Sequence, residues 1–248
     1  MNRCLLVTGG GRGIGAEVSR KAVQLGYSVC INYLKDQNSA ENLVDELNSK
    51  GNRAFVCQAD VSKEEEVVGL FERFEEQFGV PDALVNNAGV LGLQTRVDQM
   101  SAERIQRIFS VNVTGSFLCA REAVKRMSTR YGGKGGSIVN LSSGAAKYGS
   151  PGEYVDYAAS KAAVDTLTTG LAREVAEEGI RVNAVRPGFI ETEIHAAGGE
   201  PNRMERVRPM VPMKRVGKPR EVADAVLWLL SDEASYITGT ILDVSGGR

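Results

Sequence analysis

The segment from Thr8 to Gly15 limits what this chain can fold into more than any other. It reads Thr-Gly-Gly-Gly-Arg-Gly-Ile-Gly and lies between the apolar run Cys4–Val7 and a stretch with helical periodicity at residues 14–25. Glycines allow positive φ and let the backbone approach a ligand, while a helix N-terminus offers unpaired N–H groups to phosphates. The segment therefore predicts a strand, a tight turn and a helix that together hold a pyrophosphate.

Short β-rich runs and amphipathic helical stretches alternate along the whole chain. The runs lie at residues 5–8, 28–33, 53–58, 83–86, 136–141, 181–186 and 240–244. Their order predicts an α/β fold, namely a doubly wound, parallel, seven-stranded sheet with helices on both faces. Ligands of such sheets bind outside the carboxyl ends of the strands, where Thr8, Asn86 and Ser143 fall. The alternation disfavours the alternative of an ordinary glycine-rich loop.

Composition supports one domain spanning residues 1–248. With 42% hydrophobic residues the chain can bury a full core, and its net charge of −1 gives no electrostatic reason to bind nucleic acid or an anionic membrane. No apolar run approaches the roughly 20 residues of a membrane span. The first strand begins too early to leave room for a signal peptide, so a cytoplasmic location is expected.

The cysteines and the single histidine argue against a metal site. The four cysteines, Cys4, Cys30, Cys57 and Cys119, fall in apolar runs and are expected to be reduced core residues. His195 is the only histidine, which excludes an HExxH zinc motif and leaves a Ser-His-Asp triad only through that residue. No metal is expected.

Tyr157 and Lys161 stand four residues apart, so in a helix they share one face. A free tyrosine has a pKa near ~10 and is a poor acid–base catalyst at neutral pH, whereas a fixed cation nearby favours its ionised form. Such a pair also arises by chance, so its meaning depends on the motifs that accompany it.

Those motifs resemble the short-chain dehydrogenase/reductase family over residues 3–247. The family's TGxxxGxG turn appears as Thr8 to Gly15, its NNAG element at residues 86–89 and its catalytic asparagine as Asn112. Its catalytic serine is expected at Ser143, the second serine of Asn140-Leu-Ser-Ser143. The distance from Ser143 to Tyr157 is one residue longer than the family usually has. An inserted residue is therefore expected in the loop 149–156, and Ser142 stays an alternative.

The resemblance implies a Rossmann fold and a catalytic role for four side chains in hydride transfer between a nicotinamide cofactor and a carbonyl or secondary alcohol. Tyr157 would be the general acid in reduction and the general base in oxidation. Lys161 would lower the pKa of Tyr157 and hold the nicotinamide ribose. Ser143 would stabilise charge on the substrate oxygen, and Asn112 would anchor a water that links Lys161 to solvent.

Cofactor-binding residues are expected along the same crevice. Asp60 would contact the adenine, although a helix N-cap is an almost equal interpretation. Asn86 and Gly89 would shape the adenine side, and Thr192 would meet the nicotinamide carboxamide. The complete expected set is Thr8, Gly9, Gly11, Arg12, Gly13, Ile14, Gly15, Asn32, Tyr33, Lys35, Asp60, Val61, Asn87, Ala88, Gly89, Tyr157, Lys161, Pro187, Gly188, Ile190 and Thr192.

The residues after the second strand favour NADP over NAD. An NAD-specific site carries a carboxylate there for the ribose 2′-hydroxyl, whereas this chain has Asn32 and Tyr33. Arg12 and Lys35 could meet a 2′-phosphate. The first acid, Asp36, is expected to cap the next helix. The prediction is a preference for NADPH, with NAD as the alternative.

The segment 191–217 shows no clear apolar periodicity and is predicted to be a mobile lid over a small-molecule substrate. Its expected lining residues are His195 together with Glu153, Tyr154 and Phe189. The substrate itself is not indicated by these residues, and a charged lid can also be a solvated face.

Three functions are consistent with the sequence. The first is an NADP-dependent alcohol dehydrogenase or carbonyl reductase, similar to the glucose 1-dehydrogenase-like members, and the second is a 3-oxoacyl-[acyl-carrier-protein] reductase. The third, a non-catalytic dinucleotide-sensing protein, would not require the four catalytic side chains. Acyl carrier protein is acidic, and Glu177 and Glu178 disfavour its docking, although Arg126 and Arg130 could form part of a basic patch. The resemblance also implies a homotetramer, assembled through the long helices near residues 102–130 and 155–178 and the last strand.

Overall fold

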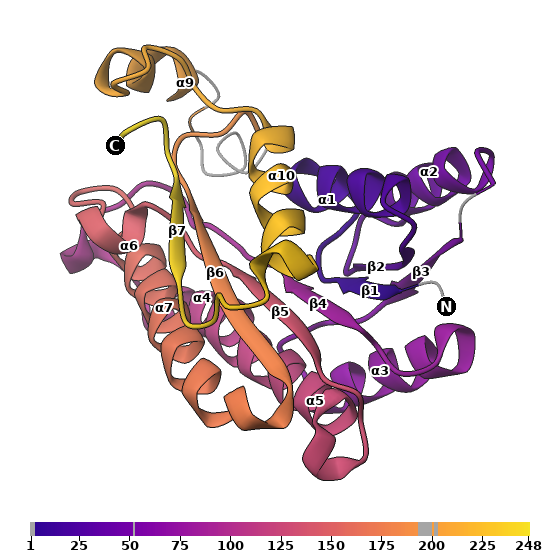
Figure 1. The fold of residues 1–248 in the computed structure, drawn as a ribbon. Coiled ribbons are helices and arrows are strands. Elements are labelled where there is room, and N and C mark those ends of the chain that lie inside the picture. The colour runs from indigo at the N-terminus through magenta and orange to yellow at the C-terminus, as the bar shows by residue number, and fades with distance from the viewer. Residues whose placement is uncertain (1–2, 52, 193–199, 201–202) are drawn as a thin grey trace.

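A computed structural model describes residues 3–51, 53–192, 200 and 203–248. Its seven strands form one parallel sheet in the order β3-β2-β1-β4-β5-β6-β7 (Figure 1). The predicted doubly wound sheet is confirmed, and its order is that of a Rossmann fold extended by one strand. The strands are β1 (Cys4–Val7), β2 (Ser28–Tyr33), β3 (Ala54–Gln58), β4 (Ala83–Asn86), β5 (Gly136–Leu141), β6 (Ile180–Pro187) and β7 (Ile241–Val244).

Helices connect the strands. The α-helices are α1 (Gly13–Gln24), α2 (Gln37–Asn48), α3 (Glu64–Phe78), α4 (Ala102–Phe109), α5 (Gly115–Met127), α6 (Ala145–Tyr148), α7 (Val155–Glu174), α9 (Arg203–Val207) and α10 (Pro219–Leu230). A π-helical stretch, Ser110–Thr114, joins α4 to α5, and 3-10 turns lie at Val97–Gln99, Thr129–Tyr131, Ala176–Glu178, Arg208–Met210 and Asp232–Ala234. Within the described ranges, no helix combines the length and the apolar character needed to cross a bilayer.

The sheet is covered on both faces, as its sequence requires. In β1, Leu5 and Val7 pack with α1, α2 and α10, whereas Cys4 and Leu6 pack on the opposite face with α3, α5 and α7. Parallel strands buried on both faces need such continuous apolar runs. All four cysteines are buried, as expected from the sequence.

The strand order changes direction between β1 and β4, which are neighbours in the sheet although β2 and β3 separate them in the chain. The turn after β1 and the segments after β4 and β5 therefore meet at one edge of the sheet (Figure 1). This edge is the place where the carboxyl ends of parallel strands leave room for a ligand.

The part of the expected lid that the structure describes is folded and anchored. It contains α9 and a following 3-10 turn, and it buries Val207, Val211 and Val216. An isolated β-bridge also joins Ile190 to Gly217 at the two ends of the segment. This part is thus anchored by buried apolar side chains although its sequence shows no clear apolar periodicity, and its role as a lid stays a prediction. His195 lies outside the described residues.

Candidate active site

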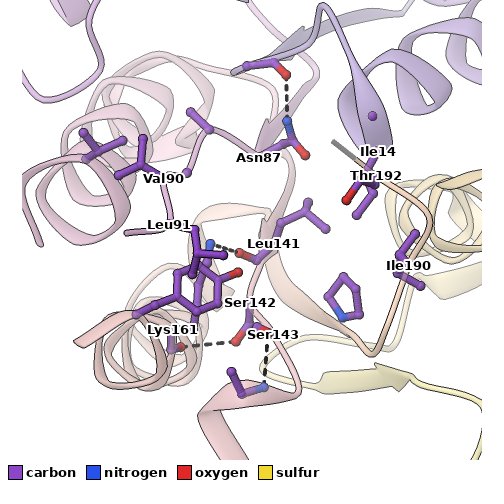
Figure 2. Close-up of a pocket in the computed structure, with 18 of the residues that line it drawn as sticks. Ile14, Asn87, Val90, Leu91, Leu141, Ser142, Ser143, Lys161, Ile190 and Thr192 are labelled. Atoms are coloured by element: carbon purple, nitrogen blue, oxygen red, sulfur yellow. Dashed lines mark hydrogen bonds between the residues drawn. The ribbon is translucent and has the colours of Figure 1, made fainter. Parts of the chain in front are cut away.

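A cleft of about 1240 Å³ opens at the carboxyl ends of the central strands. Most of the residues expected from the sequence line it (Figure 2). Four of the expected residues, Thr8, Gly15, Asn86 and Asn112, are not among the lining residues. The lining members of the expected set are Gly9, Gly11, Arg12, Gly13, Ile14, Asn32, Tyr33, Lys35, Asp60, Val61, Asn87, Ala88, Gly89, Ser143, Tyr157, Lys161, Pro187, Gly188, Ile190 and Thr192.

The glycine turn has the backbone geometry that its sequence predicts. Gly9 and Gly13 have positive φ values of 59° and 54°. A Cβ on Gly15 would lie 2.6 Å from both the Asn87 side-chain nitrogen and the Gly9 carbonyl oxygen, so no other residue fits there without a shift. Gly15 thus does not touch the cleft but permits the close packing of the turn around it.

Thr8 and Asn87 fasten the turn to the end of β4. The Thr8 hydroxyl oxygen accepts hydrogen bonds from the backbone N–H groups of Asn87 and Ala88, both at 3.0 Å. The Asn87 Nδ2 donates to the carbonyl oxygens of Thr8 and Gly9 at 2.9 Å (Figure 2). The NNAG element therefore holds the glycine turn in place and brings the ends of β1 and β4 together.

Asn32 lines the cleft, and its side chain also supports the glycine turn. Its Oδ1 accepts from the Gly9 N–H at 3.2 Å, and its Nδ2 donates to the carbonyl oxygens of Cys57 and Ala59. The side chain is buried at 2% exposure, with both ends occupied by backbone groups. It ties the glycine turn to β2 and to the end of β3.

Arg12, Lys35 and Asp36 stand together beside the end of β2. Asp36 caps α2, as predicted, by accepting from the Ser39 N–H at 3.1 Å. These hydrogen bonds from Ser39 lower the pKa of Asp36, with a smaller contribution from the Arg12 charge. One Arg12 guanidinium nitrogen lies 3.9 Å from the Asp36 carboxylate, and Lys35 is exposed at the cleft.

Two expectations for the adenine side change. Asp60 does not cap a helix, because its carboxylate accepts from the N–H and hydroxyl of Ser62 while the N-cap of α3 is Lys63. Gly89 lies at the other end of the cleft, where a Cβ would be 3.4 Å from the Lys161 Nζ. Asn86 bonds to Asn140 and is not among the cleft-lining residues.

The structure separates Ser143 from Ser142. Ser143 lines the cleft and hydrogen-bonds to the Tyr157 side chain, and its Oγ also accepts from the Ala145 N–H at 3.1 Å. Ser142 is 3% exposed, and its hydroxyl donates to the Lys161 carbonyl oxygen at 3.2 Å (Figure 2). Ser143 is therefore the serine whose hydroxyl lies beside Tyr157.

Burial dominates the electrostatics of Tyr157 and Lys161. It lowers the pKa of Lys161 to about 8, against a smaller opposing effect of Asp165. The Lys161 Nζ donates to the Leu141 carbonyl oxygen at 2.7 Å and lies 5.8 Å from the centre of the Tyr157 ring. Burial also raises the pKa of Tyr157, although the Ser143 hydrogen bond opposes it. This direction is opposite to the one expected from the sequence.

Asn112 supports the site from behind. It lies in the π-helical stretch, where its Oδ1 accepts from the Val90 N–H at 2.8 Å and its Nδ2 donates to the Val90 carbonyl oxygen and the Ser160 hydroxyl. Ser160, one residue before Lys161, was not identified from the sequence. Asn112 thus links the loop after β4 to α7.

The cleft lining also contains three arginines that no sequence pattern indicated. Arg203, Arg206 and Arg248 line the cleft with the expected residues Glu153, Tyr154 and Phe189. These arginines lie in irregular or short helical segments after β6 and after β7, where the sequence shows no motif. Across the described ranges, no group of three or more metal-binding side chains is present.

Known proteins resemble this chain along its whole length. A family model described as enoyl-(acyl carrier protein) reductase matches residues 9–248. An uncharacterized oxidoreductase, YgfF, from Escherichia coli (strain K12) is 56% identical over 243 residues, which are 98% of each chain. Glucose 1-dehydrogenase 2 of Bacillus subtilis (strain 168) is 38% identical over 98% of this chain and 93% of its own.

Two further matches extend this comparison. The 3-oxoacyl-[acyl-carrier-protein] reductase FabG of Staphylococcus epidermidis (strain ATCC 35984) is 37% identical over 100% of this chain and 99% of its own. The crystal structure of gox2181 has a TM-score of 0.92 and 33% identity, with 99% of this chain and 95% of that chain covered. The fold, the family model and these relatives agree that this chain is an oxidoreductase of the short-chain dehydrogenase/reductase family.

Proposed function

We propose that this protein is an NADP-dependent enzyme that transfers a hydride between a nicotinamide cofactor and a carbonyl or secondary alcohol. The observation that carries the proposal is the meeting of Ser143, Tyr157 and Lys161 beside the glycine turn in one cleft. A protein that only sensed dinucleotides would need the turn but not this cluster.

The cleft suits a dinucleotide. The turn between β1 and α1 has no side chain at the positions where its backbone must approach a pyrophosphate, and α1 begins directly behind it. Asp60 and Val61 would hold the adenine, while Pro187, Gly188, Ile190 and Thr192 would hold the nicotinamide end. The bound cofactor would supply or accept the hydride.

The side chains of the cluster would then handle the proton and the charge. In reduction, Tyr157 would donate its proton to the substrate oxygen, on which Ser143 would also place a hydrogen bond. Lys161 would hold the ribose hydroxyls and favour the ionised tyrosine that remains. Asn112 would hold the part of α7 that carries Lys161 in position through its hydrogen bonds to Ser160 and Val90.

The choice of NADP rests on the residues beside β2. Arg12 and Lys35 both line the cleft there, and the side chain of Asn32 is bonded to backbone groups. A 2′-phosphate would receive charge-assisted hydrogen bonds from Arg12 and Lys35. Asp36 also contacts Arg12 at this corner, and it caps α2.

Docking of acyl carrier protein is disfavoured by the charges on the surface near α5. Arg126 is ion-paired with Glu75 and Glu122, and Arg130 lies 3.8 Å from Glu178. These pairs neutralise the two arginines that could have formed a basic patch. We therefore rank carrier-protein reductase activity below activity on a free carbonyl compound.

The test is a panel of diketones, aldoses and acyl thioesters, assayed by loss of NADPH absorbance. Turnover of a free carbonyl compound supports the proposal. Turnover confined to thioesters carried on acyl carrier protein would establish the reductase alternative, and dinucleotide binding without any turnover would indicate a sensing role. The cytoplasmic location stays a prediction.

A further inference from the structure

Arg248 occupies a defined position on the substrate side of the cleft. Its guanidinium carbon lies 4.5 Å from the centre of the Phe189 ring and 5.0 Å from the centre of the Tyr148 ring. Both rings also line the cleft. Aromatic faces that contact a guanidinium restrict its orientation while leaving its N–H groups able to bind an acceptor.

The guanidinium of Arg248 differs from those of the two neighbouring arginines because no carboxylate side chain among the described residues pairs with it. Arg203 pairs with Glu153 at 2.7 Å and with Glu200 at 3.0 Å, and Arg206 contacts the same two carboxylates. Two guanidinium groups thus use two carboxylates. The guanidinium of Arg248 has no ion pair with another residue that the structure describes, and its printed contacts are with aromatic rings.

Tyr148 connects Arg248 to the end of the cleft where Ser143 and Tyr157 lie. The Tyr148 ring lies 3.8 Å from where a Cβ on Gly144 would be, and Gly144 directly follows Ser143. A substrate whose oxygen meets Ser143 and Tyr157 can therefore extend along Gly144 and Tyr148 towards the guanidinium. A planar carboxylate matches the paired donors of arginine.

We propose that the substrate is an oxo acid, reduced to the corresponding hydroxy acid, and that Arg248 binds its carboxylate. This inference rests on the proposed hydride-transfer function. In the reaction, the carbonyl carbon gains the hydride of the reduced nicotinamide, the carbonyl oxygen gains the Tyr157 proton and the C=O π bond is lost. The carboxylate is unchanged and serves only to bind.

The experiment compares oxo acids of increasing chain length with their methyl esters, using the wild type and the variants Arg248→Met and Arg248→Lys. The wild type should have the lower KM for the acid at one chain length. Arg248→Met should raise that KM about tenfold or more while leaving the KM of the ester within about twofold, because a charged hydrogen bond is lost. Arg248→Lys should recover part of the loss.

A matched control, Arg220→Met, removes an exposed charge on α10 outside the cleft and should change neither KM. Equal changes for acid and ester in Arg248→Met would show that Arg248 only packs against the rings, which would overturn the inference. Calorimetric titration of the hydroxy acid into the NADP complex gives a readout independent of turnover. If no carbonyl compound is reduced, the proposed function fails. Even then, loss of hydroxy-acid binding in Arg248→Met would support the carboxylate site. Unchanged hydroxy-acid binding in this variant would overturn the carboxylate site.

Discussion

At the scale of single residues, Ser142 and Ser143 show how two adjacent hydroxyls take different tasks. Ser143 faces the cleft and Tyr157, whereas the hydroxyl of Ser142 is used inside the protein by the Lys161 carbonyl. The strand β5 ends at Leu141, so the chain turns between the two serines and the helix α6. The proposed catalytic role therefore suits Ser143, whereas the Ser142 hydroxyl bonds inside the protein.

Substitution of Tyr157 and of each serine tests this assignment. Tyr157→Phe should reduce kcat by roughly 10²–10⁴-fold and leave the NADPH dissociation constant near the wild-type value, because it removes one proton donor and little volume. Ser143→Ala should also be severe. Ser142→Ala should keep most of the turnover and lower the free energy of unfolding by about 1 kcal/mol. Steady-state kinetics and fluorescence titration measure these effects, and a damaging Ser142→Ala beside a mild Ser143→Ala would reverse the assignment.

Lys161 predicts a pH dependence of stability. Its folded pKa of about 8 lies below the unfolded value of about 10.4, so between these values the unfolded chain binds more protons. The contribution of Lys161 to the free energy of unfolding should therefore rise with pH from 8 to 10. Below pH 8 Lys161 should be charged in both the folded and the unfolded state, so burial of its charge should lower the free energy of unfolding by a constant amount.

Urea unfolding of the wild type and of Lys161→Met at several pH values isolates this contribution. The difference, wild type minus variant, should increase by about 2 kcal/mol from pH 8 to pH 10. Taking the difference removes the effect of the buried cysteines, whose raised pKa values act in the opposite direction. A difference that stays flat or falls would contradict the lowered pKa.

Arg12 predicts the choice of dinucleotide. If it binds the 2′-phosphate, Arg12→Ala should raise the KM for NADPH about tenfold and leave the KM for NADH nearly unchanged, because only NADPH carries that charge. Kinetics with both cofactors and one carbonyl substrate provide the measurement. Catalytic efficiency in the wild type that is equal or higher with NADH would refute the preference.

At the scale of elements, one ion pair secures the start of α7, the helix that carries Tyr157 and Lys161. Arg104 on α4 contacts Asp156 at 2.7 Å and 3.2 Å, and the Asp156 side chain is only 2% exposed. The same carboxylate accepts from the Tyr157 N–H at 2.9 Å. The pair therefore fixes α4 against the first turn of α7.

Removing one partner should leave a buried charge without compensation. Arg104→Met should lower the free energy of unfolding by roughly 3 kcal/mol, and the double variant Arg104→Met/Asp156→Asn should recover a substantial part of this loss. The asparagine keeps an oxygen acceptor for the Tyr157 N–H. Chemical denaturation of the two variants and the wild type is the measurement, and equal losses in both variants would contradict the importance of the unpaired carboxylate.

Most strands and helices could be predicted because the buried strands of the sheet require continuous apolar runs in the sequence. Apolar runs buried on both faces marked every strand to within one residue at each end. The glycine turn was equally readable, since its conformation excludes other residues. Helix α9 was missed because five residues are too few to show a helical period.

Sequence alone gave the positions of the site residues better than their bonding partners. It does not reveal that backbone groups of Gly9, Cys57 and Ala59 bond to the Asn32 side chain. The pKa of Tyr157 depends on how deeply it is buried, which spacing from Lys161 does not give. Arg248 follows the last motif and gave no pattern at all.

At the scale of the whole molecule, some of the exposed apolar side chains lie on or near the elements expected to associate. Phe117 on α5 is 50% exposed and Ile105 on α4 is 39% exposed. Near the last strand, Trp228 is 40% exposed and Tyr236 is fully exposed. Apolar side chains that gather on expected contact surfaces support an assembly of several copies.

Sedimentation velocity should therefore show a tetramer, four times the 26.7 kDa chain, at micromolar concentration. Phe117→Glu should shift the population to smaller species, because a charge would be buried at the contact. Leu25→Glu provides the control, since Leu25 is 58% exposed after α1 and outside the expected contact helices. A wild-type monomer, or equal effects of the two variants, would contradict the expected assembly.

The central position of β1 also has a consequence for biosynthesis. This strand is made first, yet one of its edges pairs with β4, whose last residue is Asn86. At about 5–20 residues per second, a ribosome needs roughly 4–16 s to pass from Val7 to Asn86. Throughout that interval the nascent chain carries an unpaired apolar edge, which makes it a client for the chaperones that meet chains at the tunnel exit.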